Sequence, residues 1–81
     1  MSIERGRRKM KIGEMILRKR QASGMTQEQL AAQVPCSRTA IAQYEIGLKT
    51  PSLSIVARLA DVFGCTVDEL IGRGNDEHDD N

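Results

Sequence analysis

The sequence has few aromatic residues, histidines and cysteines, and each shortage narrows the functions to consider. Its 81 residues include no tryptophan, one tyrosine, one phenylalanine, one histidine and two cysteines. With no CxxC pair, and with His78 in an acidic tail, no metal site is expected. There is also no nucleophile beside a base, no carboxylate pair in a plausible cleft and no phosphate-binding glycine loop, so we expect neither enzyme activity nor a cofactor.

Long apolar runs are also absent. No stretch is long enough for the hydrophobic part of a signal peptide or for a membrane span. We therefore expect a cytoplasmic protein without membrane contact, in which Cys36 and Cys65 are reduced thiols packed as small apolar side chains. Eighty-one residues suffice for one domain with a single small core, which places any function on the surface.

Charge is distributed unevenly along the chain. The net charge is +1, but residues 1–50 carry ten Lys and Arg against four Asp and Glu, while residues 51–81 carry two against seven. A basic half suits a polyanionic partner, although a solvated charged surface explains charge alone equally well. We expect a flexible basic arm at 1–11 (MSIERGRRKMK), a folded domain at 12–72 and a disordered acidic tail at 73–81.

The apolar residues indicate an all-helical core. Leu, Ile, Val, Met and Ala recur at spacings of three and four, no run resembles a β-strand, and end signals delimit five helices. The first runs from Ile12 to near Ser23 and Gly24, the second opens with a Thr26–Gln29 capping box, and the third is capped by Ser37 and ends at Gly47. The fourth begins at Thr50 or Ser52 and ends at Gly64, and the fifth has a Thr66–Glu69 box and ends at Gly72. The fourth helix is expected to turn five apolar side chains inward: Leu53, Val56, Leu59, Ala60 and Phe63.

The third helix has two distinct faces. At about 100° per residue, one arc holds Arg38, Thr39, Ala42, Gln43 and Ile46, and the other side contains the core candidates Ile41 and Tyr44. In a DNA major groove, Arg can bind guanine, Gln can bind adenine, and Thr and Ala can pack on a thymine methyl. An ordinary solvated helix face is the competing interpretation.

Three neighbouring features favour binding of the third helix in a DNA major groove over an ordinary solvated helix face. Free N–H groups at Thr26 and Gln27 can meet a phosphate at the start of the second helix. The turn before the third helix has the length of a helix-turn-helix joint. Positive charge gathers on the same half of the chain, at Arg5 to Lys11, Arg18, Lys19, Arg38 and Lys49.

From Ile12 to Ile71 the sequence resembles the Cro/C1-type (Xre-like) helix-turn-helix family. The resemblance rests on TQEQLA, SRTAIAQYE, the following glycine and PSL at the spacings of that family, and it covers about three quarters of the chain. It implies an all-α, compact five-helix bundle of the lambda-repressor-like type. It also implies that the third helix, residues 37–46, enters the DNA major groove.

The resemblance assigns roles to individual residues. The base-reading positions are Arg38, Thr39, Ala42 and Gln43, with Ala42 allowing close packing, and the DNA-backbone positions are Gln27 and Lys49. Thr26 and Ser37, which begin the second and third helices, are the other expected contacts to the DNA backbone. Arg20 and Glu45 match a pair that, in some members, forms an ion pair orienting the third helix; an exposed pair of little effect is the alternative. Cys36 and Cys65 stand where the family has small aliphatic residues, which favours core packing over redox sensing.

Pro35 departs from the family, which commonly places a positive-φ glycine at this position. Proline cannot adopt positive φ and disfavours α geometry at Val34. We therefore expect the second helix to end at Gln33 or Val34 and Pro35 to run through an extended turn before Ser37. The approach angle of the third helix depends on this turn.

The sequence therefore predicts a sequence-specific DNA-binding transcriptional regulator. We expect a repressor that binds double-stranded DNA as a homodimer, on a pseudo-palindromic operator with half-sites about one helical turn apart. The C-terminal helices are the expected dimer contacts. The alternative is an antitoxin or adaptor-type protein-binding module on the same fold, and a protein effector is left open. The acidic tail DEHDD could be the contact of such a module, although a solubilising terminus is the commoner explanation of such a tail.

Overall fold

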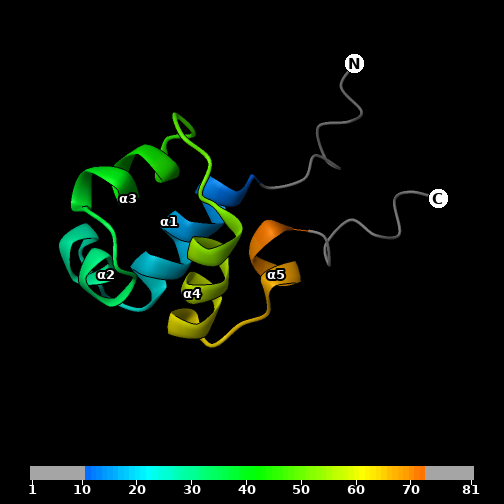
Figure 1. The fold of residues 1–81 in the computed structure, drawn as a ribbon. Helices are drawn as coiled ribbons and strands as arrows, with labels where there is room; N and C mark the ends of the chain where they lie inside the picture. Colours follow the sequence, from blue (N-terminus) through cyan, green and yellow to red (C-terminus); the bar gives the residue numbers. More distant parts are fainter. Residues whose placement is uncertain (1–10, 73–81) are drawn as a thin grey trace, which may run out of the picture.

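The computed structural model describes residues 11–72, which form five α-helices and no strand (Figure 1). The helices are α1 (Ile12–Ala22), α2 (Gln27–Gln33), α3 (Arg38–Glu45), α4 (Leu53–Phe63) and α5 (Val67–Ile71). The predicted all-α, five-helix fold is confirmed. Nearly all of the predicted basic arm and all of the predicted acidic tail, residues 1–10 and 73–81, lie outside the described residues.

The predicted end signals delimit the helices. At α2, the Thr26 hydroxyl accepts the backbone N–H of Gln29 at 3.0 Å, and the Gln29 side chain accepts that of Thr26 at 2.9 Å. The same reciprocal box joins Thr66 and Glu69 at α5. Such boxes satisfy N–H groups that the first turn of a helix leaves without partners, so the short helices begin at defined residues.

The turn between α2 and α3 agrees with the predicted end of α2 and with the absence of positive φ at Pro35. Helix α2 ends at Gln33, and Val34 is extended, with φ −116° and ψ 94°. No residue other than glycine has positive φ in the described part of the chain. The Ser37 hydroxyl then accepts the backbone N–H of Ala40 at 3.0 Å and starts α3. Pro35 is thus compatible with a short joint between two helices.

The core lies where α1 meets the other helices. Helix α1 packs against α3, α4 and α5, while α2 packs on α3, so that α2 and α3 lie at one end of the molecule and α5 at the other (Figure 1). The fully buried side chains are Ile16, Leu30, Val34, Ile41, Leu59 and Leu70. Every helix contributes at least one of them, so the positions of α2 and α3 depend on this shared core.

The prediction that Leu53 faces inward is wrong. Val56, Leu59 and Ala60 are buried as expected and Phe63 packs partly against the core, but Leu53 is 76% exposed. Leu53 is the first residue of α4, one turn before the first buried position. It shares the apolar face of the helix, but that end of α4 projects beyond the core.

Candidate nucleic-acid interface

Helix α3 exposes its first residues to solvent. Ser37, Arg38 and Thr39 are exposed, whereas Ala42 and Gln43 are half-buried. The opposite side of α3 holds the buried residues Ile41 and Glu45. The four predicted base-reading residues thus lie together on one side of the helix, and the two most exposed of them, Arg38 and Thr39, are nearest its N-terminus.

An ion pair on the buried side fixes α3 to α1. The Arg20 guanidinium donates to the Glu45 carboxylate twice, from Nε to Oε2 at 2.6 Å and from Nη2 to Oε1 at 3.2 Å. Its Nη1 donates to the Met25 carbonyl at 2.8 Å. The two charged side chains are only 13% and 4% exposed, so this is not a solvated surface pair. The contacts join α1, the segment before α2 and the end of α3.

Gln27 joins the same cluster, which the sequence did not reveal. Its Nε2 donates to Glu45 Oε1 at 2.9 Å, so the Glu45 carboxylate accepts from Gln27 and Arg20 together. The amide nitrogen has a second hydrogen, and its expected contact with a phosphate remains a prediction. Eighteen residues separate Gln27 from Glu45. Only the angle between α2 and α3 brings them together, which no local pattern encodes.

The other predicted backbone-contact residues border α3. The hydroxyls of Thr26 and Ser37 accept capping N–H groups, and each retains its own hydrogen for an outside acceptor. Lys49 is exposed, and its backbone N–H donates to the Gln43 carbonyl at 3.2 Å. The chain after α3 therefore folds back against that helix, and Lys49 stays close to its end.

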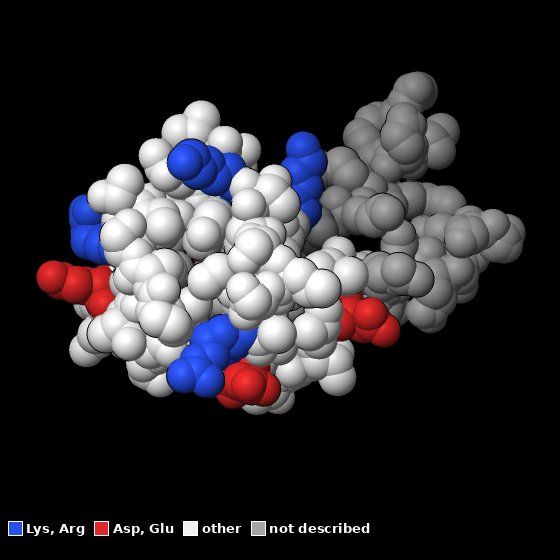
Figure 2. Space-filling view, in the orientation of Figure 1, with Lys and Arg blue, Asp and Glu red and all other residues white. Residues whose placement is uncertain are grey.

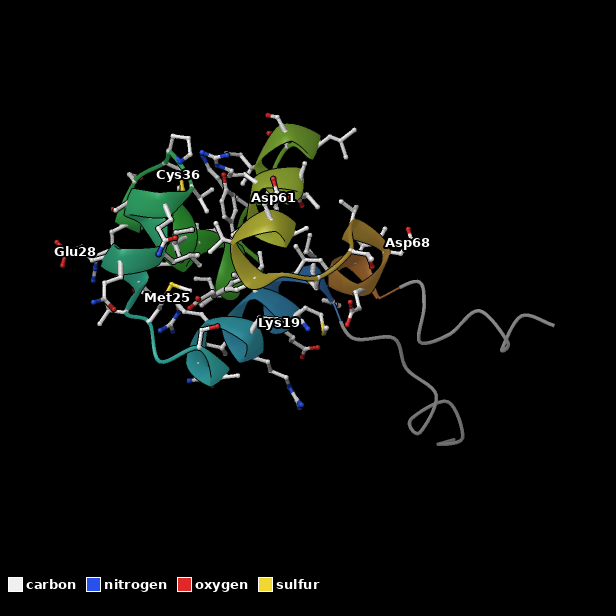
Figure 3. The ribbon with its side chains drawn as sticks, turned by 90° about the horizontal axis from the view of Figure 1, so that it is seen from below. Lys19, Met25, Glu28, Cys36, Asp61 and Asp68 are labelled. Carbon is white, nitrogen blue, oxygen red and sulfur yellow. The ribbon has the colours of Figure 1, made fainter. Side chains whose placement is uncertain are left out.

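Positive charge on the described surface is modest. Figure 2 shows Lys and Arg side chains at the upper and left edges of the view, where Figure 1 places α3 and the loop after it. Arg38 and Lys49 are the exposed cations of this region, whereas Arg20 is neutralised by Glu45. Glu28 on α2 extends outward into solvent (Figure 3), and its negative charge partly offsets the positive charge of Arg38 and Lys49.

Both cysteines pack beside the core. Cys36 and Cys65 are half-buried free thiols, and Cys36 lies in the turn between α2 and α3 (Figure 3). Burial raises the pKa of both thiols, and for Cys65 the opposing effect of Lys19 is smaller. A raised pKa keeps a thiol protonated and unreactive at neutral pH. The environment therefore fits small apolar side chains.

Two other features bear on the class of protein. Within residues 11–72, no three His, Cys, Asp or Glu side chains gather closely enough to hold a metal ion. None of the five helices has the length and apolar content needed to cross a bilayer.

Comparison with known proteins links this geometry to transcription regulators. The Helix-turn-helix family profile matches residues 16–70. The chain is 36% identical over 64 residues to the cryptic phage CTXphi transcriptional repressor RstR of Vibrio cholerae, covering 79% of this chain and 57% of that one. It is 37% identical over 62 residues to the transcriptional activator BcrR of Enterococcus faecalis, covering 76% of this chain and 30% of that one. The chain thus spans about half, or less, of the length of these relatives.

Solved structures have the same arrangement of helices. The P22 c2 repressor in complex with a synthetic operator superposes with a TM-score of 0.73 at 27% identity, covering 76% of this chain and 94% of that chain. SinR, a master regulator for biofilm formation, in complex with DNA gives a TM-score of 0.69 at 25% identity, covering 73% and 95%. Both similar structures are of regulators with DNA bound.

Proposed function

Because the chain belongs to the Cro/C1-type helix-turn-helix family, we propose that it is a sequence-specific DNA-binding transcriptional regulator that inserts α3 into the major groove. The observation that carries this proposal is the division of α3 into two sides. One side exposes Arg38 and Thr39, and the other is held to the body of the protein by Glu45. A reading helix needs both properties, because its side chains discriminate bases only when its backbone is held in one orientation.

We assign the reading chemistry to four side chains. The Arg38 guanidinium can donate to guanine O6 and N7, and the Gln43 amide can form two hydrogen bonds with adenine. Thr39 can pack its methyl group on thymine, and Ala42 leaves room for the helix to approach the bases. Thr26, Gln27, Ser37 and Lys49, which surround α3, are the proposed contacts to the sugar-phosphate backbone.

We further propose that the regulator acts as a repressor and as a homodimer, in the cytoplasm and without enzymatic activity. One α3 touches too few base pairs for strong selectivity, and two copies on a pseudo-palindrome double the number read. Half-sites about one helical turn apart place both copies on the same side of the duplex.

Selection of bound duplexes from a random pool tests this function. We expect a pseudo-palindromic consensus, and an affinity for it that falls steeply as salt rises because bound cations are released from phosphates. A protein-binding module of the antitoxin or adaptor type would enrich no sequence. If no duplex bound even at low salt, the regulator proposal would be wrong.

Substitution of a reading residue is expected to change specificity. Arg38→Ala and Gln43→Ala should each weaken binding to the selected site by about 1–3 kcal/mol and relax the choice of base at one position. The measurement is a titration of the selected duplex and of its single-base variants by fluorescence anisotropy.

Arg7 and Lys9, which lie outside the described residues, provide the control. Their replacement by alanine removes charge but no proposed base contact, so it should weaken selected and random duplexes alike. An equal loss on both kinds of DNA for Arg38→Ala would contradict its assignment as a base reader.

A further inference from the structure

Three large apolar side chains are exposed within one short segment. Ile46, Leu48 and Leu53 are 74%, 66% and 76% exposed, and they are the exposed large hydrophobic residues of the described chain. They lie between the end of α3 and the first residue of α4, and we call them the 46–53 patch. Single exposed apolar residues are ordinary, but a group of them often marks an interaction surface.

The conformation of this segment is well defined. The backbone N–H groups of Leu48 and Lys49 both donate to the Gln43 carbonyl, at 2.9 and 3.2 Å. Gly47 has a φ of 79°, which reverses the chain after α3, and Pro51 is buried. Leu48 and Leu53 are thus held outward by a loop anchored at both ends, and their exposure does not come from a free end of the chain.

From this arrangement we infer that the 46–53 patch is the contact between two copies of this chain bound to adjacent half-sites. The inference rests on the proposed function, and it narrows the expected dimer contact from the C-terminal helices in general to the start of α4 and the loop before it. Leu70 of α5 is fully buried against the chain's own core, and Val67 and Ile71 are partly buried. Helix α5 therefore has little apolar surface to offer a partner.

The position and the low charge of the 46–53 patch favour a second copy of this chain as its partner. Ile46 falls on the same arc as the proposed base readers, and Lys49, a proposed backbone contact, lies between Leu48 and Leu53 in the chain. The patch therefore adjoins the proposed DNA surface, and Leu48 and Leu53, which come after α3, are the part of it outside the reading side of that helix. Lys49 is also the one charged residue in 46–54, whereas the exposed charged residues of α4, Arg58 and Asp61, lie further along that helix. A twofold axis places such a patch against itself, apolar against apolar, with little repulsion.

The small size of the patch determines when the dimer forms. A stable interface buries about 1,200–2,000 Å² in total, far more than three side chains from each copy can supply. The contact is therefore too weak to hold two free copies together. On DNA, adjacent half-sites raise the effective concentration of one copy near the other, so the same contact appears as cooperative binding.

The test compares one half-site with two, using the full chain and the selected operator. Leu48→Gln combined with Leu53→Gln makes the patch polar, whereas Leu48→Met with Leu53→Met keeps it apolar with side chains of similar length. We expect the Gln variant to bind a single half-site like the original chain but to lose about tenfold or more on the full operator. The Met variant should retain cooperative binding.

Spacing gives an independent check, because five additional base pairs between the half-sites turn the two copies to opposite sides of the duplex. On this lengthened operator the original chain should lose cooperative binding, as the Gln variant does on the normal operator. Full cooperativity in the Gln variant would overturn the inference and leave the patch to another partner protein. An equal loss on one and two half-sites would also overturn it, because the patch would then contact DNA. Absence of binding by the original chain would instead refute the proposed function.

Discussion

Replacing Glu45 with alanine is expected to lower the free energy of unfolding by about 3–5 kcal/mol, the usual cost of breaking a buried ion pair by removing one partner. The carboxylate accepts hydrogen bonds from Arg20 and Gln27 and is almost fully buried. Its loss would leave the Arg20 guanidinium without its counter-charge in a place that water scarcely reaches. Urea denaturation followed by circular dichroism measures the change, which is a large part of the stability of a domain this small.

Two controls separate the buried charge from the loss of side-chain volume. Arg20→Met combined with Glu45→Leu replaces the pair by apolar groups of similar size and should cost much less than Glu45→Ala alone. Lys19→Ala removes one partner of the Lys19–Glu69 pair, whose side chains are 27% and 53% exposed, and should cost at most about 1 kcal/mol. If Glu45→Ala cost no more than Lys19→Ala, the cluster would not be what holds α3.

The parts of the fold that the sequence predicted are those that neighbouring residues determine. Capping boxes at Thr26 and Thr66 act over three residues, and the stop at Gly47 depends on one backbone angle. The turn at Pro35 followed from the fixed φ of proline alone. Such features are encoded locally, so they do not depend on how the helices pack together.

The features that the sequence missed or misplaced depend on tertiary packing. Apolar spacing placed Leu53 on the inner face of α4, but spacing cannot show where the core ends. The contact between Gln27 and Glu45 needs the angle between α2 and α3. For the candidate site, the outward side of α3 followed from helical spacing, whereas the burial of the ion pair required the packing of α1 on α3.

Gly13 is a further case in which packing reverses a local rule. A glycine inside a helix normally costs about 1 kcal/mol relative to alanine, so replacement by alanine would be expected to stabilise α1. Gly13, however, is buried where α1 crosses the end of α3. A Cβ atom built there would overlap the Tyr44 carbonyl oxygen and lie 3.1 Å from that of Glu45. These obstacles are backbone atoms, so the helix itself would have to move.

We therefore expect Gly13→Ala to lower the free energy of unfolding by about 3 kcal/mol, at the upper end of the range for overpacking, despite the gain in helix propensity. Ala22→Gly, at the exposed end of the same helix, measures the propensity contribution alone and should cost at most about 1 kcal/mol. Both are measured by urea denaturation. If Gly13→Ala raised the free energy of unfolding instead, α1 and α3 would be able to move apart without loss of stability. Because the same contact sets the position of α3, a destabilised but folded variant should also bind the selected operator less selectively.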